Sequence, residues 1–139
     1  MTGTLTGAGP LFALSYTNDD FHAAAVRGLD EIALPMLTTW PCLGEAMCFV
    51  RKHIGWPGQR DLFSVMSRGD VVVLRSDYYP VSVVSALMER YADTPMDLAG
   101  ASLVAAAMEL DKLDVFTFDE HFRAYLGPRR RVFRVFPTS

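Results

Sequence analysis

The sequence predicts an α/β fold in which a mostly parallel central sheet of about five strands is flanked by helices. Strand-like and helix-like segments alternate along the chain, as expected for strands joined by helical crossovers. Val71–Leu74 and Val115–Phe118 are apolar on both faces, which is typical of strands covered on both sides of a parallel sheet. With 139 residues, half of them apolar, the chain has the size of a single domain spanning 1–139.

The strand segments are short and bounded by glycine, proline or charged residues. Strands are predicted at 2–6, Met36–Trp40, Val71–Leu74, Val115–Phe118 and Val132–Phe136. Helices are predicted at Phe21–Ala33, Pro41–His53, from the Gly55–Gly58 break to about Ser67, from Pro80 to near Arg90, from Thr94 to Met108, and at Glu120–Leu126. The Gly7–Pro10 segment predicts a bend that leads into a loop, after which 11–15 packs beneath the sheet.

One helix is expected to lie inside the molecule. Thr94 has a capping hydroxyl, Pro95 suits a first helical turn, and the Asp97 carboxylate can bond back to the cap, so the helix should start there. From Leu98 to Met108 every residue is apolar except Gly100 and Ser102. The helix therefore lacks a wide polar face and belongs to the core.

Charge and composition exclude some classes of function. The net charge is -3 and the pI is about 5.5, so the protein as a whole has no basic field for nucleic acid. Arg129, Arg130 and Arg131 form the densest basic cluster. Such a run is usually a solvated face, and its functional alternative is contact with RNA phosphates.

The remaining composition predicts a soluble, cytoplasmic protein. Cys42 and Cys48 fall on different faces of one predicted helix, which makes a disulfide between them implausible and fits a reducing compartment. The first residues lack the features of a signal peptide, and no apolar run reaches the ~20 residues of a membrane span. We therefore expect no membrane association.

Asp119 follows the Val115–Phe118 strand directly. In open α/β sheets ligands bind beyond the carboxyl ends of the strands, so this carboxylate is a candidate for chemistry. Its position before Glu120 and His121 is equally typical of a helix N-cap, and we assign His121 a surface or capping role.

Four sequence segments, in this order along the chain, match the pattern of a known family: GPLFAL with DDFH, LTTWPCLGEAM, YADTPMDLAGASLVAAA, and VFTFDEHFRAYL. Together these segments resemble the PIN domain, in particular the VapC-type toxin ribonucleases of toxin-antitoxin pairs. The resemblance implies a Rossmann-like sheet with an acidic pocket at its carboxyl edge. In this family up to four carboxylates hold Mg²⁺ or Mn²⁺ for RNA cleavage.

The resemblance assigns Glu45 and Asp119 to two of the four acidic positions. The other two positions fall on Gly7 and Gly100, and Asp97 resembles an additional acid found in some members. Residue chemistry alone leaves alternatives open. Asp97 could be half of a capping box, and Glu45 could favour the positive end of its helix, although burial would call for a partner.

The resemblance therefore implies a metal-dependent ribonuclease whose site is degenerate. A hard cation needs oxygen ligands, and the loss of two acids weakens the field that attracts it, so Mg²⁺ or Mn²⁺ binding and RNA cleavage should be weak or absent. The alternative is a non-catalytic pseudo-nuclease that binds RNA or an antitoxin protein. A homodimer is also expected. Trp40, Trp56 and Phe63 could belong to a protein-binding surface, although aromatic residues beside turns are more often the edges of a core.

Overall fold

The computed structural model describes residues 1–138 and confirms the predicted α/β class. All five strands are parallel, in the order β3-β2-β1-β4-β5. Their bounds are β1 Thr4–Thr6, β2 Met36–Thr38, β3 Val71–Val73, β4 Asp114–Phe116 and β5 Arg134–Phe136. β1 is therefore the central strand. The next two strands along the chain, β2 and β3, lie on one side of it, and β4 and β5 lie on the other.

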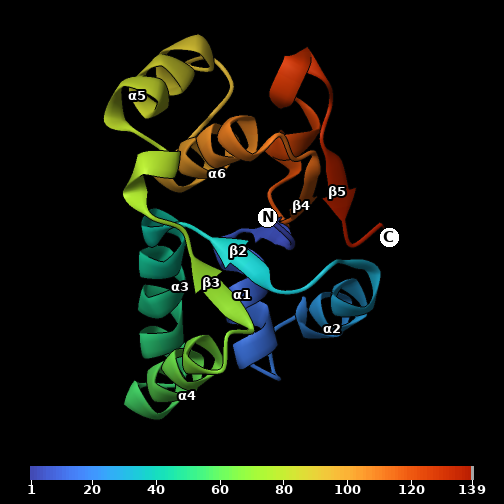
Figure 1. Cartoon of the computed structure of the whole chain (residues 1–139). Helices are drawn as coiled ribbons and strands as arrows, with labels where there is room; N and C mark the ends of the chain where they lie inside the picture. The colour runs from blue at the N-terminus through green and yellow to red at the C-terminus, as the bar shows by residue number, and fades with distance from the viewer. Residues whose placement is uncertain (139) are drawn as a thin grey trace.

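Helices cover both faces of this sheet (Figure 1). In Figure 1 helices α5 and α6 lie above the strands, and α1 to α4 lie in the lower half of the molecule. The α-helices are α1 Ala8–Ser15, α2 His22–Glu31, α3 Trp40–His53, α4 Trp56–Ser67, α5 Val81–Arg90 and α6 Leu98–Leu110. Three short 3₁₀ turns complete the described chain: η1 Ser76–Tyr78, η2 Glu120–Arg123 and η3 Pro128–Arg130.

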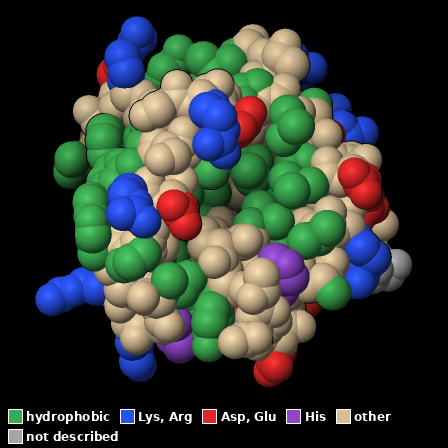
Figure 2. Space-filling model, turned by 90° about the horizontal axis from the view of Figure 1, so that it is seen from below, with side chains coloured by type: hydrophobic (Ala, Val, Ile, Leu, Met, Phe, Trp, Pro, Cys, Tyr) green, Lys and Arg blue, Asp and Glu red, His purple; other side chains and the backbone are tan. Residues whose placement is uncertain are grey.

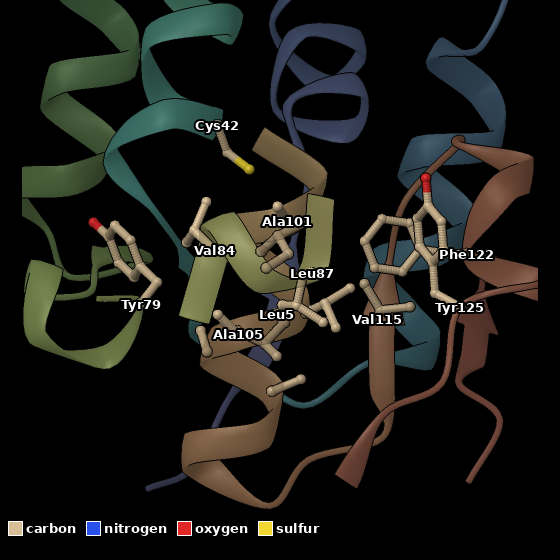
Figure 3. Packing of buried hydrophobic residues seen from close by; sticks show 14 of the residues in the cluster. Leu5, Cys42, Tyr79, Val84, Leu87, Ala101, Ala105, Val115, Phe122 and Tyr125 are labelled. Atoms are coloured by element: carbon tan, nitrogen blue, oxygen red, sulfur yellow. The ribbon is translucent and has the colours of Figure 1, made fainter. Parts of the chain in front are cut away.

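Each face of the sheet has its own core, and neighbouring strand residues alternate between them. Leu37 and Val115 join the core beneath α5 and α6, whereas Met36 and Phe116 join the core with α1 and α2. This is the two-residue period of a strand. Figure 3 shows the first core, in which Leu5 and Val115 lie close to side chains of α5 and α6.

Helix α6 is the buried helix that the sequence predicts. Every residue from Gly100 to Ala107 is buried, and most of them are small. Small side chains let the helix lie close to the sheet and to α5. Because no described helix is long and apolar enough, none could cross a membrane. Within residues 1–138 both cysteines are free thiols, Cys42 buried and Cys48 exposed.

The structure corrects the predicted loop after the first strand. Residues Ala8–Ser15 form helix α1 instead. Gly9 and Pro10 indicated a bend, but both lie in the first turn of α1. There the backbone N–H groups have no partner within the helix, so proline removes no hydrogen bond.

The start of α6 is also corrected. Asp97, not Thr94, is its N-cap, with extended backbone and a side chain that accepts the Gly100 N–H at 2.7 Å. The Pro95 carbonyl instead accepts a hydrogen bond from the Tyr125 hydroxyl at 2.5 Å, which holds this segment as a loop. A contact across 30 residues of sequence thus replaces the predicted capping box.

Other predicted boundaries shift in smaller ways. Trp40 is the first residue of α3 rather than the end of β2, and α2 begins at His22. The predicted helix Glu120–Leu126 is only the 3₁₀ turn Glu120–Arg123. The last predicted strand begins at Arg134, because Val132 instead forms an antiparallel bridge with Leu126.

Candidate functional site

The sheet has a topological switch point at its centre. From β1 the chain proceeds outward through β2 and β3, then returns to the other side of β1 as β4 and β5. Ligands of open α/β sheets bind at such a point, beyond the carboxyl ends of the strands. A cleft of about 650 Å³ lies there, and its walls include Gly7 after β1 and Thr117–Asp119 after β4. We call it the carboxyl-edge cleft.

The structure brings the three predicted acids together in this cleft. Glu45 of α3, Asp97 at the start of α6 and Asp119 after β4 all line it. These residues lie far apart along the chain, and only the parallel arrangement of β1, β2 and β4 places their elements at one edge of the sheet.

Asp119 is positioned by local hydrogen bonds. Its N–H donates to the Thr117 hydroxyl at 3.1 Å, and its Oδ1 accepts the His121 N–H at 2.9 Å. It is therefore the N-cap of η2, as one alternative predicted, and it still faces the cleft. His121 Nδ1 lies 2.9 Å from the same oxygen, so this histidine is also part of the cleft wall.

Asp97 likewise caps a helix and faces the cleft. Its side chain accepts the Gly100 N–H, so one of its oxygens is already engaged. The Thr39 hydroxyl lies 2.7 Å from the Ser102 hydroxyl, and both groups are buried. This contact fixes the start of α3 against α6 and thereby holds the helices that carry Glu45 and Asp97.

Glu45 is half-buried and carries no ion pair among the described residues, contrary to the predicted partner. Burial is the largest cause that raises the pKa of its carboxyl, and the charges of Asp97 and Asp119 raise it further. No lysine or arginine is among the described residues that line the cleft. The cleft thus concentrates negative charge that no lysine or arginine among its described lining residues neutralises.

Gly7 and Gly100 face the same cleft. Gly7 has ordinary extended backbone, and a Cβ there would meet the Thr117 hydroxyl oxygen at 3.3 Å. A Cβ on Gly100 would meet Asp97 Oδ1 at 3.1 Å. Neither glycine has a positive φ that forbids a side chain, so an acid at each position is compatible with the backbone after small local shifts.

The donor set does not form a ready metal centre. Within residues 1–138, no three His, Cys, Asp or Glu side chains are grouped so that they could hold a metal ion. Asp97 and Asp119 each commit one carboxylate oxygen to capping a helix or turn. A Mg²⁺ or Mn²⁺ ion needs several oxygen ligands around one point, so the residues present do not fit such an ion without rearrangement.

The arginine cluster lies away from the cleft. Arg129 pairs with Asp111 at 3.3 Å, and Asp111 caps the carboxyl end of α6, whereas Asp97 caps its amino end. A helix of 13 residues is about 20 Å long. Arg129, Arg130 and Arg131 are exposed, and none of them is among the described residues that line the cleft.

The exposed aromatic residues also differ from expectation. Trp40 and Trp56 are each 58% exposed and Phe63 is 47% exposed, so describing them as edges of the core is wrong. Phe49 and Tyr91 both line the cleft, although neither is predicted from the sequence to belong to the site. Phe49 follows Glu45 by one helical turn, and that spacing was the signal that could have identified it.

The five-stranded parallel sheet with its flanking helices has the PIN-domain α/β fold. Among solved structures, Mycobacterium tuberculosis VapC20, a Sarcin-Ricin loop cleaving toxin, superposes on this chain with a TM-score of 0.75. The match covers 87% of this chain and 93% of that chain at 18% sequence identity, which shows the shared fold. No protein-family model and no curated protein matches the sequence.

Proposed function

We propose that this chain is a VapC-like PIN-domain protein that binds RNA at the carboxyl-edge cleft, and that its metal-dependent cleavage of RNA is weak or lost. The observation that carries the proposal is the convergence of Glu45, Asp97 and Asp119 on the cleft, with Gly7 and Gly100 in the same wall. The fold shared with a ribonuclease toxin supports the class of substrate.

The physical reason for weak cleavage is the number and state of the oxygen ligands. Glu45 has a raised pKa because it is partly buried beside two other acids, so the ionised form is disfavoured when no cation is present. Asp97 and Asp119 are partly engaged as caps. To coordinate a divalent ion with all their oxygens, Asp97 and Asp119 would have to give up these hydrogen bonds. Gly7 and Gly100 have no side chain that could supply a further ligand.

The test restores the missing acids. RNA cleavage is measured with Mg²⁺ or Mn²⁺ for the unaltered chain and for a Gly7→Asp/Gly100→Asp double variant. We expect at least tenfold faster cleavage by the double variant, which corresponds to about 1.4 kcal/mol of transition-state stabilisation.

Two controls accompany this test. A Gly7→Asn/Gly100→Asn variant introduces similar volume without charge and should remain as slow as the unaltered chain. Adding Glu45→Gln to the double Asp variant should abolish the gain. Robust metal-dependent cleavage by the unaltered chain would show that the site is not degenerate.

The arginines are proposed to contact RNA phosphates outside the cleft. Arg130 and Arg131 are exposed and form no ion pair with the described residues, unlike Arg129. Removing both side chains should weaken single-stranded RNA binding about equally for all sequences. The negative slope of log affinity against log salt concentration should then become shallower by about 1.4. An unchanged slope would remove these residues from the interface.

We infer in addition that the partners include an antitoxin protein and a second copy of this chain. A second hollow of about 580 Å³, between α1, α2 and α4, supports protein contact because most of its lining residues are apolar. Figure 2, which views the molecule from below, shows hydrophobic side chains around a hollow with charged groups near its rim. Light scattering after size-exclusion chromatography measures the assembly, and a strictly monomeric protein at micromolar concentration would contradict the homodimer.

A further inference from the structure

Four aromatic rings form a cluster at the surface between α1 and α3, which lie side by side (Figure 1). Phe12 and Tyr16 come from α1 and its C-cap, and Phe49 and His53 come from α3. The Phe12 ring lies 5.7 Å from Tyr16, 5.7 Å from Phe49 and 5.1 Å from His53, and Tyr16 lies 5.4 Å from His53, between ring centres. We call these four residues the aromatic ridge.

The aromatic ridge is separate from the packed interior. Neither of the two hydrophobic cores includes Phe12, Tyr16 or Phe49. Phe49 is 41% exposed and His53 is exposed, while Phe12 and Tyr16 are half-buried. Rings that contact one another and still face solvent offer flat apolar surface to a ligand.

The ridge continues directly from the carboxyl-edge cleft. Glu45, Phe49 and His53 are spaced by four residues and lie on successive turns of one face of α3, over about 12 Å. Phe49 lines the cleft together with Glu45. On α1, Gly9 and Ala8 line the cleft one turn before Phe12. A ligand that leaves the cleft between α1 and α3 therefore meets these rings first.

A basic group stands on the same face. Lys52 follows Glu45 by seven residues, or two helical turns, and so projects near the line of Glu45 and Phe49. It is exposed and forms no ion pair with a described residue. Aromatic rings and an unpaired ammonium on one side of α3 match the two parts of a nucleotide, the flat base and the anionic phosphate.

We propose that the aromatic ridge stacks an unpaired RNA base that neighbours the nucleotide held in the carboxyl-edge cleft, with Lys52 contacting the intervening phosphate. The inference rests on the proposed function and names the form of its substrate, single-stranded RNA. Because every base has a π-face, stacking on the ridge tolerates different sequences. It favours unpaired RNA, in which the face of a base is accessible. In a duplex, stacking between neighbouring base pairs would cover the face that the ridge needs.

The test is a double-mutant cycle between protein and RNA. Affinity is measured for short single-stranded RNAs, intact or with one abasic position scanned along the strand, against the unaltered chain and Phe49→Leu. We expect Phe49→Leu to weaken binding of the intact RNA about tenfold. At one position the abasic change should weaken binding similarly, and the two changes together should add nothing further.

Phe63→Leu is the matched control. Phe63 is comparably exposed on α4, contacts the Trp56 ring at 6.5 Å between ring centres, and does not line the cleft. It should leave RNA affinity unchanged. Fluorescence of 2-aminopurine placed at the sensitive position should be quenched on binding to the unaltered chain and to Phe63→Leu, and much less on binding to Phe49→Leu. Thermal unfolding of each variant checks that it is folded.

The outcomes separate this inference from the proposed function. If the unaltered chain binds no RNA, the proposed function fails and the stacking role fails with it. If RNA binds but the two changes are additive at every position, or Phe49→Leu binds as well as Phe63→Leu, the stacking role alone is overturned. A Phe49→Leu variant that keeps RNA affinity but loses self-association would assign the ridge to a protein contact.

Discussion

The two ends of helix α6 carry an aspartate each, and the two residues are in opposite situations. Asp97 at the amino end caps the helix with extended backbone and faces the carboxyl-edge cleft. Asp111 at the carboxyl end has left-handed backbone, with φ of 53°, and pairs with Arg129. An acid is favourable at the positive amino end of a helix and unfavourable at the negative carboxyl end.

The difference shows how the fold distributes its charge. At the carboxyl edge of the sheet three acids line one cleft without a lysine or arginine among the described cleft residues, and the amino end of α6 is a favourable position for Asp97. At the other end of α6 the acid is compensated by an arginine from a turn 18 residues later. The cleft thus keeps negative charge that no lysine or arginine among its described lining residues compensates.

The largest expected effect on stability is at the amino end of α6. Asp97→Ala removes the side chain that accepts the Gly100 N–H and should lower the free energy of unfolding by about 1 kcal/mol. Asp97→Asn keeps the cap and should lower it by much less. Chemical denaturation measures both. Equal losses for the two variants would mean that charge, not capping, is the role of Asp97 in stability.

A smaller effect of opposite sign is expected at the carboxyl end. Asp111→Gly relieves the left-handed conformation and removes a negative charge from the negative end of the helix, so it should stabilise the fold by up to about 0.5 kcal/mol. The lost pair with Arg129 is exposed and contributes little. Asp111→Asn, which tolerates this conformation, should give part of the gain in the same denaturation experiment. Destabilisation by both variants would instead show that the pair with Arg129 outweighs the backbone strain and the unfavourable helix dipole.

The smallest effect is expected inside the cleft and depends on pH. The pKa of Glu45 is raised in the fold, so the unfolded chain loses this proton more readily and stability falls as pH rises through that range. Glu45→Gln should therefore raise Tm at pH 7, by less than the change expected for Asp97→Ala. Well below the ordinary pKa of a glutamate, about 4.3, the carboxyl is protonated in both states and the difference should vanish. A pH-independent difference would indicate packing rather than charge.

Local patterns predicted much of the architecture. Runs such as Val71–Leu74 and the long apolar segment before Met108 indicated buried strands and a buried helix, because periodicity and apolar content act over a few residues. The cap at Asp119 was likewise readable from its neighbours. The likeness to VapC-type PIN domains predicted which edge of the sheet would hold the acids.

Boundaries that depend on distant contacts were missed. The Tyr125 hydroxyl on the Pro95 carbonyl sets where α6 begins, and no pattern within 94–98 encodes that contact. The first turn of α1 was not predicted because Gly9 and Pro10 usually indicate a bend. A helix tolerates proline in its first turn, and that is where Pro10 lies.

The sequence by itself determined the α/β class, the buried character of α6 and the identity of the acids and glycines. Only the tertiary structure decided that Glu45, Asp97 and Asp119 share one cleft, that the arginines lie about one helix length away, and that an aromatic ridge extends from Glu45. The physical reason is range: helix and strand patterns arise from neighbours in the chain, whereas a site is formed by strand order, which joins residues many positions apart.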